Sequence, residues 1–216
     1  MTAVYFWRIR KSSVPLALMH MAFDRFLLKR IPGLTFFKSI GTGTGEKFTP
    51  SDADPLVWGL IAVVEDPSVL DSSRVVRSWS RISQSHMRLI LEPLSSHGAW
   101  AGVNPFIASQ SKSNGKIVAI TRARIKWSKN LLFWRAVPPV TQSLHSQPGL
   151  LRALGIGEAP IGLQGTLSIW DSAESLRNFA YKGAAHTDAI AATEKHQWYS
   201  EELFARFSLL EMRGSI

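Results

Sequence analysis

Hydrophobic positions in the first half of the chain follow the strand period and the helix period in turn. Residues 4–9 are rich in aromatic and β-branched side chains and predict a strand. Apolar residues then recur at spacings of three and four, which predicts an amphipathic helix before Pro32; they are Leu16, Met19, Phe23, Phe26 and Leu27. Further strands are predicted at residues 36–40, 56–64 and 86–93, and a second helix at residues 68–82.

The second half repeats this order after a linker rich in Ser, Gly, Asn and Pro at residues 95–115. Strands are predicted at 117–127, 163–170 and 204–212, helices at 131–144 and 173–193, and a Gly-rich segment up to Gly157. The order βαββαβ therefore occurs twice, as in two tandem ferredoxin-like folds. We predict an α+β protein whose halves, residues 1–109 and 110–216, close their sheets on each other as one barrel.

A short phrase that occurs twice supports this duplication. Pro32-Gly33-Leu34 matches Pro148-Gly149-Leu150 at an offset of 116 (148 minus 32), and Ile40-Gly41 matches Ile156-Gly157 at the same offset. Residues 59–65 match residues 165–171 at an offset of 106 (165 minus 59), so the second connecting loop is shorter. We expect residues 3–94 and 116–212 to superpose, with Gly41 and Gly157 in equivalent turns.

Composition removes several classes of chemistry. The 216 residues include no cysteine, which excludes disulfides, iron–sulfur clusters, zinc–thiolate sites, cysteine nucleophiles and thiolate-ligated haem. The net charge of +9 comes from scattered Lys and Arg without a nucleic-acid-binding motif, so nucleic acid is not an expected partner. We find no apolar run of membrane-spanning length and no signal-peptide pattern, and expect a cytoplasmic protein that can contact a membrane peripherally.

His186 is the strongest candidate for a metal ligand among the six histidines. It falls on one stripe of the last predicted helix with Leu176, Phe179, Gly183 and Ile190, and so points towards the core. The preceding Gly183-Ala184-Ala185 leaves room for a flat group, and one axial histidine on a helix is a common way to hold haem. A core histidine bonded to a backbone carbonyl explains the same pattern. His20 is a weaker candidate.

Three basic residues alternate on one face of the strand at 117–127. These residues are Arg122, Arg124 and Lys126, and an arginine on this face can pair with the carboxylates of a cofactor. Arg135, in the aromatic start of the next helix, is a further candidate for this role. A solvated strand face explains the alternation equally well.

Seven segments resemble the spheroidene monooxygenase family. They are GTGTGEKFTP from Gly41, LSSHGAWAGVNPF from Leu94, FWRAVPPV from Phe133, GIGEAPIG from Gly155, SIW at 168–170, FAYKGAAH ending at His186, and WYSEELFARF from Trp198. The resemblance implies a relative of the dimeric α+β barrels with haem b on His186. It also implies that O2 and an external electron donor convert a methylene near the end of an acyclic carotenoid to a hydroxy and then a keto group.

Two alternatives remain open beside this hypothesis. One is a haem enzyme of the same barrel type that performs dehydration, peroxidation or nitrogen-group chemistry on a small molecule. The other is a non-enzymatic protein that binds haem or a lipophile. The expected partners are a lipophilic substrate, an electron-donor protein, an anionic membrane surface contacted by the basic exterior, and further copies of the chain.

Overall fold

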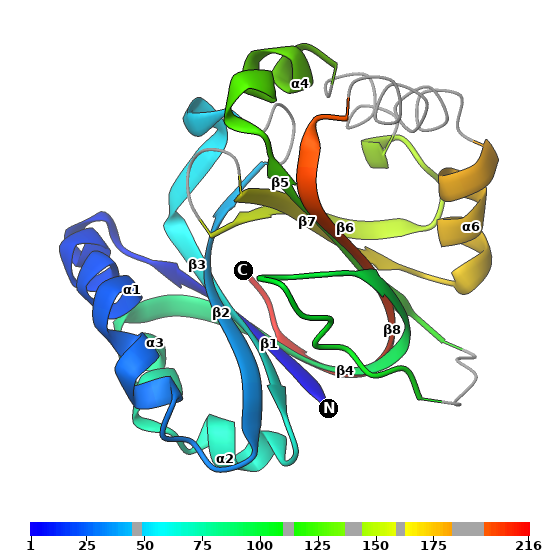
Figure 1. The fold of residues 1–216 in the computed structure, drawn as a ribbon. Coiled ribbons are helices and arrows are strands. Elements are labelled where there is room, and N and C mark those ends of the chain that lie inside the picture. Colours follow the sequence, from blue (N-terminus) through cyan, green and yellow to red (C-terminus); the bar gives the residue numbers. More distant parts are fainter. Residues whose placement is uncertain (45–48, 110–114, 137–143, 159–162, 183–196) are drawn as a thin grey trace.

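Eight antiparallel strands close a barrel in the computed structural model, which describes residues 1–44, 49–109, 115–136, 144–158, 163–182 and 197–216 (Figure 1). Around the barrel the order is β1-β3-β2-β6-β7-β5-β8-β4. The strands are β1 (Thr2–Ile9), β2 (Leu34–Gly43), β3 (Ala53–Val64), β4 (Ser83–Gly98), β5 (Ile117–Ile125), β6 (Leu150–Gly157), β7 (Leu163–Trp170) and β8 (Tyr199–Gly214). The helices are α1 (Val14–Leu28), α2 (Pro67–Asp71), α3 (Arg74–Ile82), α4 (Asn130–Ala136) and α6 (Ala173–Lys182).

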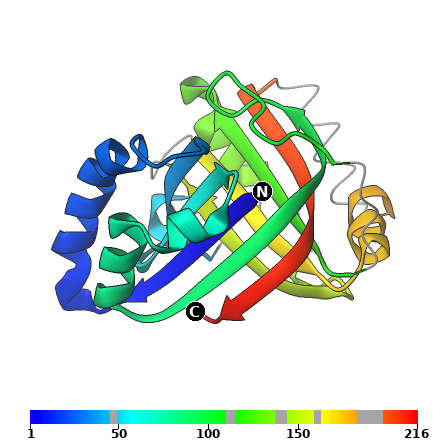
Figure 2. The same cartoon turned by 90° about the horizontal axis from the view of Figure 1, so that it is seen from below.

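Each half contributes four neighbouring strands to the barrel. The first half supplies β4-β1-β3-β2 and the second supplies β8-β5-β7-β6, and the halves join where β2 pairs with β6 and β4 pairs with β8. The helices lie outside, with α1 to α3 over the first half and α4 and α6 over the second (Figures 1 and 2). The predicted fold of tandem ferredoxin-like repeats in one barrel is confirmed. The boundary at residue 109/110 stays a prediction, because residues 110–114 lie outside the described part.

Equivalent turns before β2 and β6 confirm the internal repeat. Gly33 and Gly149 both have a positive φ, +70° and +85°, which glycine adopts without steric cost. The Gly33 carbonyl accepts a hydrogen bond from the Glu65 amide at 3.1 Å, and the Gly149 carbonyl accepts one from the Asp171 amide at 2.9 Å. The prediction that Gly41 and Gly157 occupy turns is wrong. They pair with each other across the β2–β6 seam, where the halves meet.

Element boundaries differ from the predictions where side chains cap a helix or a strand continues. The helix predicted at residues 68–82 is split into α2 and α3, because the Ser73 hydroxyl accepts the Val76 amide and starts a new helix. β4 extends to Gly98, where the pattern predicted a linker. In the second half, the described helices end at Ala136 and Lys182, and residues 137–143 and 183–193 of the predicted helices lie outside the described part.

The predicted core face of α1 is wrong for four of its five apolar residues, because only Leu27 packs against the core. Leu16, Met19, Phe23 and Phe26 are 42 to 60% exposed, whereas Asp24 is only 4% exposed. The Trp79 indole on α3 donates a 2.8 Å hydrogen bond to Asp24 and draws this carboxylate inwards. Because α1 carries apolar residues almost all round, the spacing of its apolar positions does not specify which face is buried.

Apolar side chains fill the barrel interior. Trp100 and Phe106, from the connection between β4 and β5, are 1% and 3% exposed and pack among inward-facing strand residues. The partly buried C-terminal Ile216 packs against the same cluster, and the C-terminus lies in the middle of the ring of strands in Figure 1. The barrel is thus closed around a packed core.

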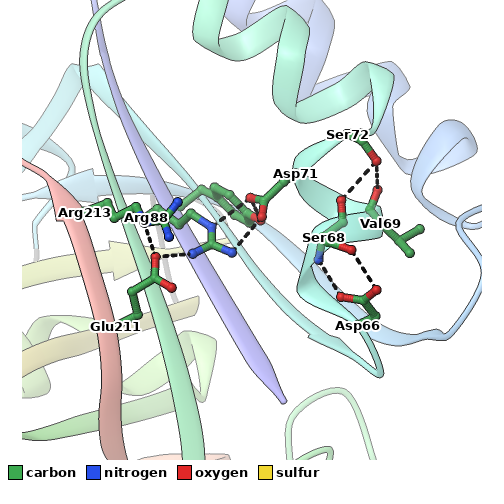
Figure 3. Close-up of polar contacts among 9 residues, drawn as sticks. Asp66, Ser68, Val69, Asp71, Ser72, Arg88, Glu211 and Arg213 are labelled. Atoms are coloured by element: carbon green, nitrogen blue, oxygen red, sulfur yellow. Dashed lines mark hydrogen bonds and ion pairs between the residues drawn. The ribbon is translucent and has the colours of Figure 1, made fainter.

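An ion-pair network ties the outer helices to the β4–β8 seam (Figure 3). The Arg88 guanidinium donates to Asp71 at the end of α2 and to Glu211 on β8, at 2.6 and 2.8 Å. The Tyr5 hydroxyl donates to Asp71 at 2.7 Å. Burial, followed by the neighbouring Asp71 carboxylate, raises the pKa of Tyr5, so the phenol keeps the proton that it donates.

Candidate functional site

The described residues include only part of the site predicted from the sequence. His186 lies outside them, and for Arg135 only the backbone at the end of α4 is described. Arg122 and Arg124 are described, and both project from β5 on the face opposite to Thr121 and Ala123. The described part of the site therefore consists of the two faces of β5.

Small side chains form the outer face of the second-half sheet. The β5 residues Thr121 and Ala123 lie beside Thr166 and Gln164 of β7, and Gly155 of β6 pairs with Thr166. Thr121 is exposed although it is in the middle of β5. We call the residues Thr121, Ala123, Thr166 and Gly155 the small-residue floor.

The equivalent surface of the first half is filled by large side chains. At the offset of 116, Tyr5 corresponds to Thr121 and Trp7 to Ala123. The strand partner of Tyr5 is Leu60, which corresponds to Thr166, the partner of Thr121, at the offset of 106. Tyr5 and Trp7 are 3% and 1% exposed, and their rings stack at 5.5 Å between centroids. The same fold is thus solidly packed in one half, while in the other half it has small residues where the first has aromatic rings.

Two separate apolar clusters flank the small-residue floor. Ile117 and Ala119 pack with Phe179 of α6 at one end of β5, and Ile125 packs with Phe133 of α4 at the other. Between them, Phe204 of β8 pairs with Thr121 and is 37% exposed. An exposed aromatic ring beside small residues offers a flat apolar surface to a ligand.

In the first half, a tryptophan from an outer helix packs on this surface. Trp79 of α3 stacks on Trp7 at 5.3 Å between ring centroids. In the sequence, the offset of 106 aligns Trp79 with Ala185, which directly precedes His186. The second half therefore has alanine where the first half has Trp7 and Trp79, and Gln164 where it has Trp58.

These residues fit a flat, largely apolar cofactor such as haem on the outer face of the second half. The floor would accept the macrocycle where Tyr5 and Trp7 fill the first half. With no cysteine in the chain, a histidine is the expected iron ligand, and no cluster of three or more metal-ligating side chains occurs among the described residues. A single histidine such as His186 is compatible with this composition.

The opposite face of β5 carries a buried charge network around Arg122. Its guanidinium, 2% exposed, donates to Glu158 at 2.9 Å and also to Glu201. Glu158 also accepts hydrogen bonds from Lys38 at 2.8 Å and from the Trp100 indole at 2.7 Å. The solvated-face interpretation therefore fails for Arg122 but suits Arg124, which is 47% exposed and 3.8 Å from Glu201.

Both carboxylates of this network are held in the charged form. Burial raises the pKa of Glu158, but hydrogen bonds from Lys38 and Trp100 and the charge of Arg122 outweigh it and hold the pKa below its usual range. Burial likewise raises the pKa of Glu201. Hydrogen bonds from the backbone amides of Gly102 and Ala101 and from the Arg122 guanidinium outweigh burial and hold this pKa below its usual range. The two carboxylates thus neutralise the charge of Arg122 without any contribution from a cofactor.

Sequence reasoning missed Glu158, Glu201 and Trp100. Each lies in a different segment that carried the family resemblance, GIGEAPIG, WYSEELFARF and LSSHGAWAGVNPF, and the structure brings all three together around Arg122. The signal that could have found Glu158 was a single acidic residue in the otherwise apolar motif GIGEAPIG, which needs a cationic partner when buried.

His20 has a structural role in the first half. Its Nδ1 lies 3.1 Å from Asp24 on α1, and its ring lies against Trp79 at 5.2 Å between centroids. These contacts agree with the ranking of His20 as a weaker candidate ligand than His186.

Comparison with known proteins decides the family. The chain is 36% identical to the spheroidene monooxygenase of Rhodobacter capsulatus over 94% of its own length and 87% of that protein's. It is 32% identical to the spheroidene monooxygenase of Cereibacter sphaeroides over 90% of its own length and 61% of that protein's. The chain belongs to the spheroidene monooxygenase family. This membership assigns it to the monooxygenases.

Solved structures of other proteins share the fold of this chain. An aldoxime dehydratase matches with a TM-score of 0.60 at 12% identity, over 96% of this chain and 80% of that one. This likeness shows the fold alone, the dimeric α+β barrel type. No protein-family model matches the chain. None of the described helices is both long enough and apolar enough to cross a membrane.

Proposed function

We propose that this protein is a haem-dependent monooxygenase that oxidises an acyclic carotenoid or a similar lipophilic polyene. The observation that carries the proposal is the 36% identity to a spheroidene monooxygenase over 94% of the chain. The small-residue floor supports it independently, because it presents small side chains where the first half has the rings of Tyr5 and Trp7.

In this proposal His186 would hold the haem iron, and Arg135 would pair with the haem propionates. A propionate role for Arg122 would require it to leave Glu158 or Glu201, since the guanidinium already pairs with both. Arg122 and Arg124 also both project from the face of β5 opposite to the floor, so neither is placed beside a haem bound there. A bound haem supplies O2 activation with electrons from an external donor.

The residues of the chain would orient the substrate and exclude water. Phe204, exposed beside Thr121, offers an apolar contact for a polyene, and the clusters around Phe179 and Phe133 limit access of water from both sides. Two hydroxylations at one carbon give a geminal diol, which loses water to leave the ketone. Each hydroxylation consumes one O2 and two electrons from the donor and releases one water.

The experiment is a haemin titration of the purified protein, followed by turnover of an acyclic carotenoid with a chemical or protein electron donor. We expect a Soret band that saturates at one haem per chain, and hydroxy and keto products. His186→Ala should keep the circular dichroism spectrum but bind haem weakly, with partial rescue by imidazole. His97→Ala, which removes an exposed histidine of β4, is the matched control.

Three outcomes distinguish the hypotheses. Saturable haem binding with no turnover of any polyene would favour a haem-binding protein or a haem enzyme for small molecules. No specific haem binding would refute the cofactor assignment. A native Soret spectrum and full activity in His186→Ala would move the ligand to another histidine, and His20→Ala would be tested next.

A further inference from the structure

The outward face of α1 is apolar, although no described element packs on it. Leu16, Met19, Phe23 and Phe26 lie at spacings of three and four on this face and are 42, 57, 60 and 50% exposed. Leu18, at the edge of the face, is 55% exposed. Side chains on the opposite face of α1 pack on the sheet and α3, and α1 is the outermost element on its side of the molecule (Figures 1 and 2). We call these five residues the α1 apolar patch.

The patch is surrounded by positive charge. Eight exposed basic residues lie on or beside α1 and on the neighbouring α3: Arg10, Lys11, Arg25, Lys29, Arg30, Arg74, Arg77 and Arg81. Within the described part of the chain, none of them forms a salt bridge. The single acidic residue of the two helices, Asp24, is buried and accepts the Trp79 indole. The surface therefore combines exposed apolar side chains with uncompensated cations.

This combination fits an anionic lipid bilayer. Helices that lie in a membrane interface insert Phe and Leu side chains into the headgroup boundary, while Lys and Arg contact anionic headgroups. A second copy of the chain is a poorer occupant, because two identical faces would oppose like charges. We propose that α1 lies in the surface of an anionic membrane, with the α1 apolar patch inserted and the arginines of α3 against the headgroups.

Membrane binding by α1 would bring the enzyme to a lipophilic substrate, and in this purpose it rests on the proposed function. Vesicle binding requires neither haem nor turnover, so the two proposals succeed or fail separately.

The experiment measures cosedimentation with vesicles of phosphatidylcholine alone and of phosphatidylcholine mixed with phosphatidylglycerol. We expect binding to the mixed vesicles that weakens as salt rises. Phe23→Glu/Phe26→Glu should lower the partition coefficient at least about tenfold, because it removes the apolar contact and adds anionic charge. The matched control, Ile107→Glu/Leu210→Glu, makes the same change in charge at exposed apolar positions outside the patch and should bind more tightly than the patch variant.

Two further variants separate the apolar and electrostatic contributions. Arg74→Gln/Arg77→Gln/Arg81→Gln should weaken binding at low salt on the order of 100-fold, and much less at high salt. Because the chain has no cysteine, Met19→Cys accepts a single environment-sensitive fluorophore. Its emission should shift to the blue on mixed vesicles, whereas a label at Ile107→Cys, an 88% exposed position, should not shift.

Three results would overturn the proposal. The first is wild-type protein that does not bind the mixed vesicles. The second is a label on Met19→Cys that stays in water while the protein binds. The third is a wild-type dimer, without vesicle binding, that Phe23→Glu/Phe26→Glu converts to a monomer, which would make the patch an interface between copies of this chain.

Discussion

Removing the Arg122 guanidinium should destabilise the fold much more than removing that of Arg124. Arg122 is 2% exposed and pairs with Glu158 and Glu201, so Arg122→Ala leaves two carboxylates without their shared partner. Breaking a buried ion pair by removing one member costs about 3–5 kcal/mol. Arg124 is 47% exposed and 3.8 Å from Glu201, so we expect Arg124→Ala, the matched control, to cost about 1 kcal/mol or less.

Urea denaturation at neutral pH measures both losses in the free energy of unfolding. The dependence of this free energy on urea concentration should be the same in wild type and variants, which shows that the folded and unfolded states keep their compactness. For a chain of this length, 3–5 kcal/mol lowers the melting temperature by about 6 to 20 °C. If Arg122→Ala does not fold, Arg122→Lys, which keeps the charge but loses the second hydrogen bond, should give an intermediate loss. A loss below about 1 kcal/mol, or an equal loss in Arg124→Ala, would refute the network as a stabilising feature.

The pH dependence gives a second test of the same network. The folded-state pKa of Glu158 and of Glu201 lies below the unfolded value of about 4.3, so their contribution to the free energy of unfolding is full above that pH. It is lost as the pH falls through the folded-state values. Without Arg122 these pKa values rise, and the difference in stability between wild type and Arg122→Ala should narrow below about pH 4. A constant difference across this range would contradict the assignment.

The remaining predictions concern the floor, α3 and the repeat. Thr121→Tyr, which copies the first half, should lower haemin affinity at least about tenfold, whereas Thr35→Tyr at an exposed position of β2 should not. Trp79→Phe should cost about 1–3 kcal/mol in chemical denaturation, because buried Asp24 loses its indole donor. Gly149→Ala should cost at least about 1–2 kcal/mol in the same assay, because φ is +85° there and the added methyl group would clash with the side chain of Ser175.

The repeated βαββαβ order and the barrel class follow from local patterns in the sequence. Gly33 and Gly149 mark equivalent turns because a positive φ is a local requirement that only the residue type satisfies readily. Strand and helix periods are likewise local, so most elements could be predicted, with errors at capped or extended ends such as Ser73 and Gly98. The family resemblance also came from short segments, and the comparisons confirmed it.

Which faces of these elements are buried was decided only by the tertiary structure. α1 is apolar nearly all round, so its orientation depends on Asp24 meeting Trp79, a residue 55 positions away. Only the pairing of strands in the second-half sheet brings Glu158 and Glu201 to Arg122, because β6 and β8 are separated from β5 by helices in the sequence. Periodicity reports on neighbours within one element, whereas a buried charge or an exposed apolar face depends on contacts between elements.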